Sequence, residues 1–312
     1  MVEFKVASGR SNLPLAQKVA NHLGISLAET SIRNFKDGEI WVKYEENVRG
    51  IDLFVVQSTF APADNLMELL QLIDAAKRAS ARRITAVIPY YGYARQDRKD
   101  QPRVSITAKL VANLLQRAGA DRIITIDLHS SQIQGFFDVP MDHLYASPVL
   151  IRALRKLGLQ NIAVASPDVG GIKTARAYSK RIGGDLVLVD KRRPNHNVAE
   201  IMHIIGEVKD KNVVIVDDMI DTGTTFVKCA EALKANGAKD ITGLTVHPVF
   251  SGEATQMIEE SDAISRVYVT DTIPLNGEYK KIQVVSVAEL LAEAIIRTHD
   301  NRSISSLFEI ER

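Results

Sequence analysis

The chain has 312 residues, and at ~150 residues per domain this length predicts two domains that can each bury a core. Lys and Arg number 39 and Asp and Glu number 38, so the net charge is +1 and nothing favours nucleic acid as a partner. Hydrophobic residues are 46% and charged residues 25% of the chain, which excludes general disorder.

One cysteine, Cys229, cannot form an internal disulfide or a multi-thiolate metal site, and this favours a reducing compartment. The first residues show no basic segment followed by an apolar run, and no stretch approaches the ~18 apolar residues of a membrane span. We therefore expect a cytoplasmic protein that has no membrane partner.

Short apolar, β-branched runs recur along the chain and predict strands that are buried on both faces of a parallel sheet. These runs are residues 4–8, 52–58, 84–89, 122–128, 161–166, 186–190, 212–218, 241–248 and 266–270. Amphipathic helices are expected at 64–79, 105–118, 148–157 and 224–236. Strands that alternate with helices predict an α/β architecture with right-handed crossovers.

Internal repetition indicates that the two domains are copies of one plan. Three short matches recur in the same order, at offsets of 158, 160 and 157 residues. They are Val6-Ala7-Ser8 with Val164-Ala165-Ser166, Val48-Arg49 with Val208-Lys209, and Ile84-Thr85 with Ile241-Thr242. We therefore predict domains at 1–146 and 147–312.

The segment 213–225, VVIVDDMIDTGTT, is the clearest candidate for a site, because a buried strand is followed by a helix start. Ligands of open α/β sheets bind beyond the carboxyl ends of strands, where helix N-termini favour anions. Gly223 lets the backbone approach a phosphate, and the carboxylates of Asp217 and Asp218 suit sugar hydroxyls or magnesium. A phosphorylated sugar fits this combination; the alternative is that Asp221 only caps the helix and the Asp pair is a solvated strand end.

The same segment is similar to the phosphoribosyl-diphosphate motif of type I phosphoribosyltransferase folds. The chain resembles bacterial class I ribose-phosphate diphosphokinases over about residues 4–308, through the motifs FKDGE, PYYGYARQDRK, ITIDLHSSQIQGFFD, SPDVGG and DKRRP. This resemblance implies two tandem phosphoribosyltransferase-like domains, each with a mainly parallel sheet flanked by helices. It also implies that Mg-ATP donates a diphosphoryl group to ribose 5-phosphate, giving phosphoribosyl diphosphate and AMP for nucleotide, histidine and tryptophan biosynthesis.

The resemblance assigns site residues in both halves. For ATP it implies the FKDGE turn, which receives adenine from a neighbouring subunit, a basic loop and one histidine: Phe35, Asp37, Gly38, Glu39, Arg95, Gln96, Asp97, Lys99 and His129. For Mg²⁺ it implies His129 and Asp168, and for catalysis Lys191 and Arg193. For ribose 5-phosphate it implies Arg193, Asp217, Asp218, Asp221, Thr222, Gly223, Thr224 and Thr225.

Simpler alternatives stay open for several of these residues. FKDGE reads alone as a turn with a core Phe, the two basic clusters as solvated surface, and His129 as a structural histidine. Among activities, a phosphoribosyltransferase or a regulatory subunit without turnover are the alternatives.

A homo-hexamer with phosphate and ADP as regulators is also implied by the resemblance. The residues that match the regulatory site are Arg49, Ser80, Gln134, Ser303 and Ser305. Asn47 stands where some relatives have Ser, and Ser105 stands where proline is usual.

Overall fold

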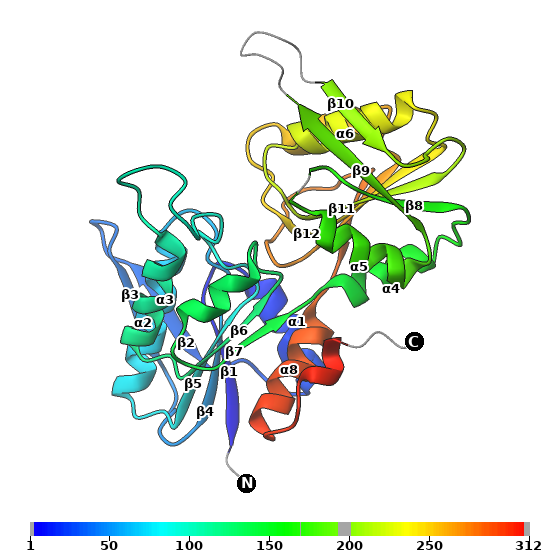
Figure 1. The fold of residues 1–312 in the computed structure, drawn as a ribbon. Coiled ribbons are helices and arrows are strands. Elements are labelled where there is room, and N and C mark those ends of the chain that lie inside the picture. The colour runs from blue at the N-terminus through cyan, green and yellow to red at the C-terminus, as the bar shows by residue number, and fades with distance from the viewer. Residues whose placement is uncertain (1–2, 169, 193–200, 309–312) are drawn as a thin grey trace. The chain divides into compact units, whose positions relative to one another are not determined.

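The computed structural model describes residues 3–168, 170–192 and 201–308 (Figure 1). These residues form two compact units. Unit 1 comprises Met1–Tyr145, Thr272–Pro274 and Ser286–Arg312, and unit 2 comprises Ala146–Asp271 and Leu275–Val285. The first border lies within one residue of the expected one, but the C-terminal segment from Ser286 belongs to unit 1, whereas the sequence reading assigned it to the second domain.

Unit 1 is built on a five-stranded, fully parallel sheet in the order β1-β4-β5-β6-β7. Its strands are β1 (Phe4–Ser8), β4 (Asp52–Val56), β5 (Arg83–Ile88), β6 (Arg122–Ile126) and β7 (Met141–Leu144). A separate antiparallel hairpin is formed by β2 (Thr30–Asn34) and β3 (Ile40–Tyr44). The helices are α1 (Leu13–Leu23), α2 (Asp64–Arg78), α3 (Thr107–Ala118), η1 (Ser131–Phe136), α8 (Ala288–His299) and η2 (Ser305–Phe308).

Unit 2 contains a seven-stranded sheet in the order β10-β9-β8-β11-β12-β13-β14, in which only the β9–β10 pair is antiparallel among the described residues. Its strands are β8 (Ile162–Ser166), β9 (Asp185–Arg192), β10 (Ile201–Ile205), β11 (Asn212–Ile220), β12 (Asp240–Pro248), β13 (Arg266–Thr270) and β14 (Ile282–Val285). Its helices are α4 (Ser147–Arg155), α5 (Ile172–Ile182), α6 (Thr224–Ala235) and α7 (Ala254–Glu260).

The duplication is confirmed by the strand order. In each unit the first parallel strand is followed by a helix and an antiparallel hairpin, and the next parallel strand then returns beside the first. β1 and β8, which carry the repeated Val-Ala-Ser, therefore occupy the same position in the two plans, and so do β4 and β11. The fold class predicted from the alternation of strands and helices is confirmed.

The C-terminal segment returns to unit 1 because α8 has an apolar face that α1 covers (Figure 1). Polar groups fix its end: His299 Nδ1 lies 2.8 Å from Asp52 Oδ2, and Arg83 Nη2 donates to the Thr298 carbonyl at 3.1 Å. The His299 ring also stacks at 4.7 Å between centroids on Phe4 of β1. Residues from both ends of the chain thus complete the core of unit 1.

All nine predicted strands and four predicted helices are present, with two informative extensions. β9 continues to Arg192 because it pairs with β10, and β11 continues to Ile220 because it pairs with β12 as far as Pro248. Lys191 and the Asp217–Asp218 pair therefore lie on strands, and were expected at strand ends or in a loop. Within the described part of the chain, every helix is too short or too polar to cross a membrane.

Candidate active site

The segment between β11 and α6 forms a tight turn at the carboxyl edge of the unit 2 sheet. Two hydrogen bonds tie it to the loop after β12: Phe250 N donates to the Ile220 carbonyl at 3.0 Å, and Ser251 N donates to the Asp221 carbonyl at 2.9 Å. The turn is therefore supported from both adjacent strands, and its polar side chains are left at the surface, where Thr222 and Thr224 are exposed.

Gly223 occupies the N-cap position of α6 with φ +79°, in the left-handed region. A Cβ atom there would lie 3.2 Å from Ala254 Cα and 3.3 Å from Ala254 Cβ, so α7 leaves little room for a side chain. The glycine thus serves both the turn and the close packing of α7. The N-cap residue of α6 is Gly223 and not Asp221, and a glycine has no side chain to cap the first N–H groups of the helix.

Three carboxylates of unit 2 influence one another at this edge. Burial holds the pKa of Asp217 well above its ordinary value, and the negative charge of Asp218, a side-chain hydrogen bond between the two carboxyl groups and the charge of Asp168 act in the same direction. The backbone N–H of Asp218 donates to Asp217 Oδ1 at 2.9 Å, which acts in the opposite direction. The edge is thus strongly electronegative, and hydroxyl donors or a cation would relieve the repulsion.

Asp168 follows β8 and turns toward the start of α5. Its Oδ1 accepts a hydrogen bond from Gly171 N at 2.8 Å, and its carbonyl accepts one from Ser166 Oγ at 2.7 Å. The N–H of Gly171 is therefore directed at a carboxylate of its own loop. A diphosphate that used this N–H would therefore have to displace the Asp168 carboxylate.

Of the two expected catalytic residues, Lys191 lies on β9, where its backbone is paired with Met202 of β10. Arg193 lies outside the described residues. Their predicted roles stay predictions.

The FKDGE turn forms the tip of the β2–β3 hairpin in unit 1. Phe35 N donates to the Glu39 carbonyl at 2.8 Å, and Gly38 N donates to the Phe35 carbonyl at 3.0 Å. Gly38 has φ +98°, and Asp37 Oδ1 accepts from Glu39 N at 3.1 Å. The Phe35 side chain is 47% exposed, so the alternative of a core Phe is wrong. A large aromatic ring held at an exposed tip is suited to contact a ligand or a partner.

The YYGYARQDRK segment follows β5 and is anchored by its first residues. Tyr91 is buried and its hydroxyl donates to the Ala108 carbonyl at 2.9 Å, and Gly92 packs directly against the Thr59 backbone. Gln96 is held at the start of α3, because Ala108 N donates to its carbonyl at 3.1 Å.

Beyond that anchor the basic side chains are open to solvent. Arg95, Gln96 and Lys99 are exposed and Asp97 is half-buried. The hydroxyls of Ser105 and Thr107 lie 2.6 Å apart, and Thr107 Oγ1 donates to Gln96 Oε1 at 2.5 Å. The serine at position 105 therefore belongs to a hydrogen-bonded chain at the N-terminus of α3.

His129 is exposed just after β6 in unit 1, while Asp168 belongs to unit 2. The expected metal pair is thus divided between the units and stays a prediction. Within the described ranges there is no cluster of three or more His, Cys, Asp or Glu side chains able to hold a metal. The oxygen donors of Asp168, Asp217 and Asp218 nevertheless fit magnesium, which takes one or two carboxylates and completes its shell with phosphate and water.

The residues expected in a regulatory site all lie in unit 1. The turns of Arg49 and Ser80 meet, because Gly50 N donates to the Ser80 carbonyl at 2.9 Å. Ser303 Oγ accepts from Ser305 N at 3.2 Å, and Gln134 Nε2 lies 3.3 Å from His143 Nδ1. A cavity of about 620 Å³ opens in the same unit, at the amino ends of the strands. Its lining residues are Asp52, Arg82, Arg83, Asp121, His299, Asp300 and Asn301.

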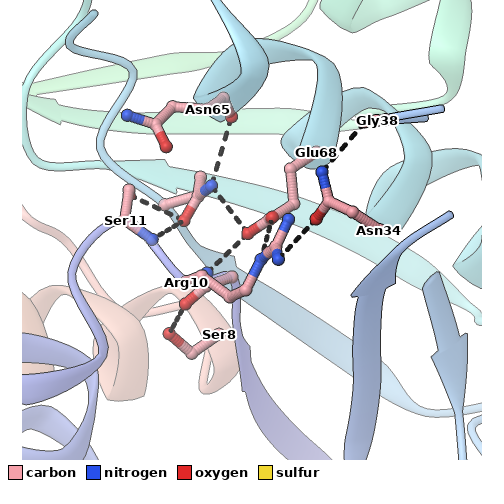
Figure 2. Close-up of polar contacts among 9 residues, drawn as sticks. Ser8, Arg10, Ser11, Asn34, Gly38, Asn65 and Glu68 are labelled. Atoms are coloured by element: carbon pink, nitrogen blue, oxygen red, sulfur yellow. Dashed lines mark hydrogen bonds and ion pairs between the residues drawn. The ribbon is translucent and has the colours of Figure 1, made fainter. Parts of the chain in front are cut away.

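The sequence reading missed a polar cluster at the carboxyl edge of the unit 1 sheet (Figure 2). Gln57 follows β4 as Asp217 follows Val216 of β11, so the two residues are counterparts in the duplicated plan. The Gln57 side chain accepts from Ser11 N at 3.1 Å and donates to the Asn65 carbonyl at 3.2 Å and to Glu68 Oε1 at 3.1 Å. In unit 1 the counterpart of the predicted sugar site is therefore filled by the protein's own side chains.

The comparison with known proteins covers nearly the whole chain. The family model for the N-terminal domain of ribose phosphate pyrophosphokinase matches residues 4–119, and that for the phosphoribosyl synthetase-associated domain matches residues 163–309. The ribose-phosphate pyrophosphokinase of Chlorobaculum tepidum is 56% identical over 308 residues, which are 98% of this chain and 95% of the relative. That of Wolinella succinogenes is 53% identical over 306 residues, or 98% of this chain and 99% of the relative.

A solved structure agrees with these relatives. The crystal structure of phosphoribosylpyrophosphate synthetase from Mycobacterium smegmatis superposes with a TM-score of 0.90 at 40% identity, covering 96% of this chain and 99% of that one.

Proposed function

Because this chain belongs to the ribose-phosphate pyrophosphokinase family of enzymes, we propose that it transfers the diphosphoryl group of ATP to the anomeric hydroxyl of ribose 5-phosphate. The anomeric oxygen attacks the β-phosphorus and the bond from that phosphorus to the α,β-bridging oxygen breaks. AMP leaves, the hydroxyl proton is lost, and 5-phosphoribosyl 1-diphosphate is formed. The observation that carries the proposal is the acidic strand end of β11 followed directly by the Gly223 turn at the start of α6.

This turn supplies two complementary environments within a few residues. The N-terminal N–H groups of α6 and the hydroxyls of Thr222, Thr224 and Thr225 would bind the 5-phosphate. Asp217 and Asp218 would accept hydrogen bonds from the sugar hydroxyls, which would partly offset the burial and the repulsion that raise the pKa of Asp217. The carbonyl of Asp221 accepts the hydrogen bond from Ser251 N that fixes the turn. Asp221 would thereby set the distance between the phosphate-binding turn and the two carboxylates that bind the sugar hydroxyls.

The nucleotide would be held by residues of the N-terminal half. The exposed ring of Phe35 offers a stacking face for adenine, with Asp37, Gly38 and Glu39 shaping the turn around it. Arg95 and Lys99 are exposed residues whose cationic groups suit phosphate oxygens. Gln96, Asp97 and His129 complete the proposed nucleotide side.

Lys191 and Arg193 would act on the transferring group itself. A compact ammonium stabilises negative charge that develops on the phosphoryl oxygens, and positioning accounts for the rest of such a transfer. Mg²⁺ would be bound near His129 and Asp168, where it neutralises phosphate charge. The carboxylate of Asp168 would supply a hard oxygen donor of the kind that this ion prefers.

We further propose a cytoplasmic homo-hexamer that supplies nucleotide, histidine and tryptophan biosynthesis and is regulated by phosphate and ADP. The turns of Arg49 and Ser80 are joined by the hydrogen bond from Gly50 N to the Ser80 carbonyl, and the guanidinium of Arg49 would suit an anionic regulator. Ser303 and Ser305 would add hydroxyl donors, and Gln134 an amide, to such a site.

Phosphorus NMR tests the reaction directly. Protein, ATP, ribose 5-phosphate and Mg²⁺ should give AMP and a new diphosphate ester in equal amounts, and omission of ribose 5-phosphate should abolish AMP formation. ADP as the product would refute the proposed bond cleavage. Release of pyrophosphate from added phosphoribosyl diphosphate, dependent on a nucleobase, would identify a phosphoribosyltransferase instead.

A further inference from the structure

We propose that Glu68, Arg10 and Asn34 form a relay that positions the Phe35–Glu39 turn for the adenine of ATP. This inference rests on the function proposed above for that turn. The three residues come from α2, from the loop after β1 and from the end of β2, and their side chains point toward one another in Figure 2. They are positioning residues, because they act through the turn.

The relay begins at a fixed point inside unit 1. The Glu68 side chain is 3% exposed and its carboxylate accepts three hydrogen bonds. Two come from Arg10, through its backbone N at 2.5 Å and its Nε at 2.6 Å, and the third from Gln57 at 3.1 Å. A buried carboxylate with three donors has little freedom, so it fixes both the backbone and the side chain of Arg10.

From this fixed point the Arg10 guanidinium extends to the hairpin. Its Nη1 donates to Asn34 Oδ1 at 2.7 Å. The planar fork lets one side chain engage Glu68 and Asn34 at once, which the single ammonium of a lysine cannot reproduce with the same geometry. The five-stranded sheet and the β2–β3 hairpin are separate sheets, and Arg10 connects them near the hairpin tip.

Asn34 passes the connection to the turn itself. While its Oδ1 accepts from Arg10, its Nδ2 donates to the Gly38 carbonyl at 2.9 Å. Both ends of the amide are thus used, and the second end holds the residue whose φ of +98° closes the turn. Phe35, the neighbour of Asn34, is placed by the same turn.

The opposite end of the hairpin is held by other means. Ile32, Val42 and Tyr44 pack against the core of unit 1, and the Tyr44 hydroxyl donates to the Leu72 carbonyl at 3.1 Å. At the tip, in contrast, Phe35 is 47% exposed and apolar packing does not fix it. A polar relay is therefore the means by which the stacking face can be held before ATP arrives, which lowers the ordering cost of binding.

The single tryptophan of the chain gives a readout that needs neither ATP nor activity. Trp41 lies on β3 opposite Arg33, whose guanidinium carbon is 4.3 Å from the ring centroid, one residue pair away from Asn34. In Asn34→Ala, the ligand-free protein should show lower Trp41 fluorescence anisotropy and stronger quenching by acrylamide than wild type. Ser31→Ala is the matched control, because it removes an exposed 2.6 Å hydrogen bond to Glu45 from the same hairpin, farther from the tip.

Steady-state kinetics provide the second readout. Asn34→Ala and Arg10→Lys should raise KM for ATP about fivefold, which corresponds to about 1 kcal/mol and one hydrogen bond. KM for ribose 5-phosphate and kcat should stay at wild-type values, and so should all constants of Ser31→Ala. Asn34→Asp keeps the acceptor for Arg10 and removes the donor to Gly38, so it should behave as Asn34→Ala does.

Unchanged Trp41 quenching in Asn34→Ala, or an equal change in Ser31→Ala, would overturn the relay. Phe35→Ala separates this failure from that of the proposed function. If Phe35→Ala raises KM for ATP and Asn34→Ala does not, the relay is wrong and the adenine site stands. If both leave KM for ATP unchanged, the proposed role of the turn is wrong as well.

Discussion

Replacing Gly223 by alanine tests whether the turn before α6 needs a glycine for its backbone and for the space beside α7. The φ of +79° alone costs an L-residue about 1 kcal/mol. A new Cβ would also lie 3.2 Å from Ala254 Cα and 3.4 Å from its carbonyl oxygen, and a helix backbone yields little. We expect a total cost of about 2 kcal/mol, since overpacking of this kind adds about 1 kcal/mol or more.

The same unit offers a matched control in Gly252, which has φ +60° and where a new Cβ would have nothing within 4 Å. Gly252→Ala should cost only the backbone term of about 1 kcal/mol and lower Tm by about 3 °C, whereas Gly223→Ala should lower it by about 6 °C. Ribose 5-phosphate at 100 times its Kd should stabilise wild type and Gly252→Ala by about 2.7 kcal/mol. This ligand-induced shift should be lost in Gly223→Ala. Equal losses of Tm in the two variants, or a wild-type ligand-induced shift in Gly223→Ala, would refute the steric argument.

Three further changes probe the same edge of unit 2. The raised pKa of Asp217 means that the folded state binds its proton more tightly than the unfolded state, so this stability is present below the ordinary pKa of 3.8 and is lost as pH rises through the folded value. Asp217→Asn should therefore raise Tm of the ligand-free protein at pH 7 and give a gain that disappears below that ordinary pKa; a constant gain would contradict this. Lys191→Ala should lower kcat by ~10²-fold or more in the AMP assay, and a tenfold or smaller drop would remove Lys191 from the mechanism. Cys229 is buried and its pKa is raised to about 12 by burial and by the charges of Asp217 and Asp168, so the native protein should resist iodoacetamide at pH 7 and react after unfolding; rapid labelling of the native thiol would contradict this.

Much of the fold is readable from apolar runs, because a strand of a covered parallel sheet is apolar on both faces. The run at 212–218 predicts β11, with the polar Asp217–Asp218 pair at its end. The strand continues to Ile220 because β12 offers pairing partners there, and this pairing is a tertiary effect that local sequence does not contain. The same reason explains the extension of β9 through Lys191.

In the candidate site too, local sequence predicts one part and tertiary contacts determine the other. The Gly223 turn is encoded in consecutive residues, so the sequence predicts the turn itself, and the ligand roles of its residues stay predictions. The relay of Glu68, Arg10 and Asn34 joins residues that are 24 and 58 positions apart, with no spacing that distinguishes them from surface charges. One signal was available: Gln57 is the counterpart of Asp217 in the duplicated plan, and a change of chemistry there points to a different use of the first copy.

The packing of α8 on unit 1 has a consequence for the folding of the protein during translation. The apolar side of α1 is covered by α8, and α8 is translated well after Tyr145, where the main part of unit 1 ends. At ordinary elongation rates the ribosome needs roughly 7–30 s to pass from Tyr145 to α8. Nascent chains in that interval hold an incomplete N-terminal module while the second one emerges. Expression of residues 1–145 alone would reproduce this incomplete intermediate. Co-expression of α8 as a separate peptide would supply the missing helix and complete the core of unit 1.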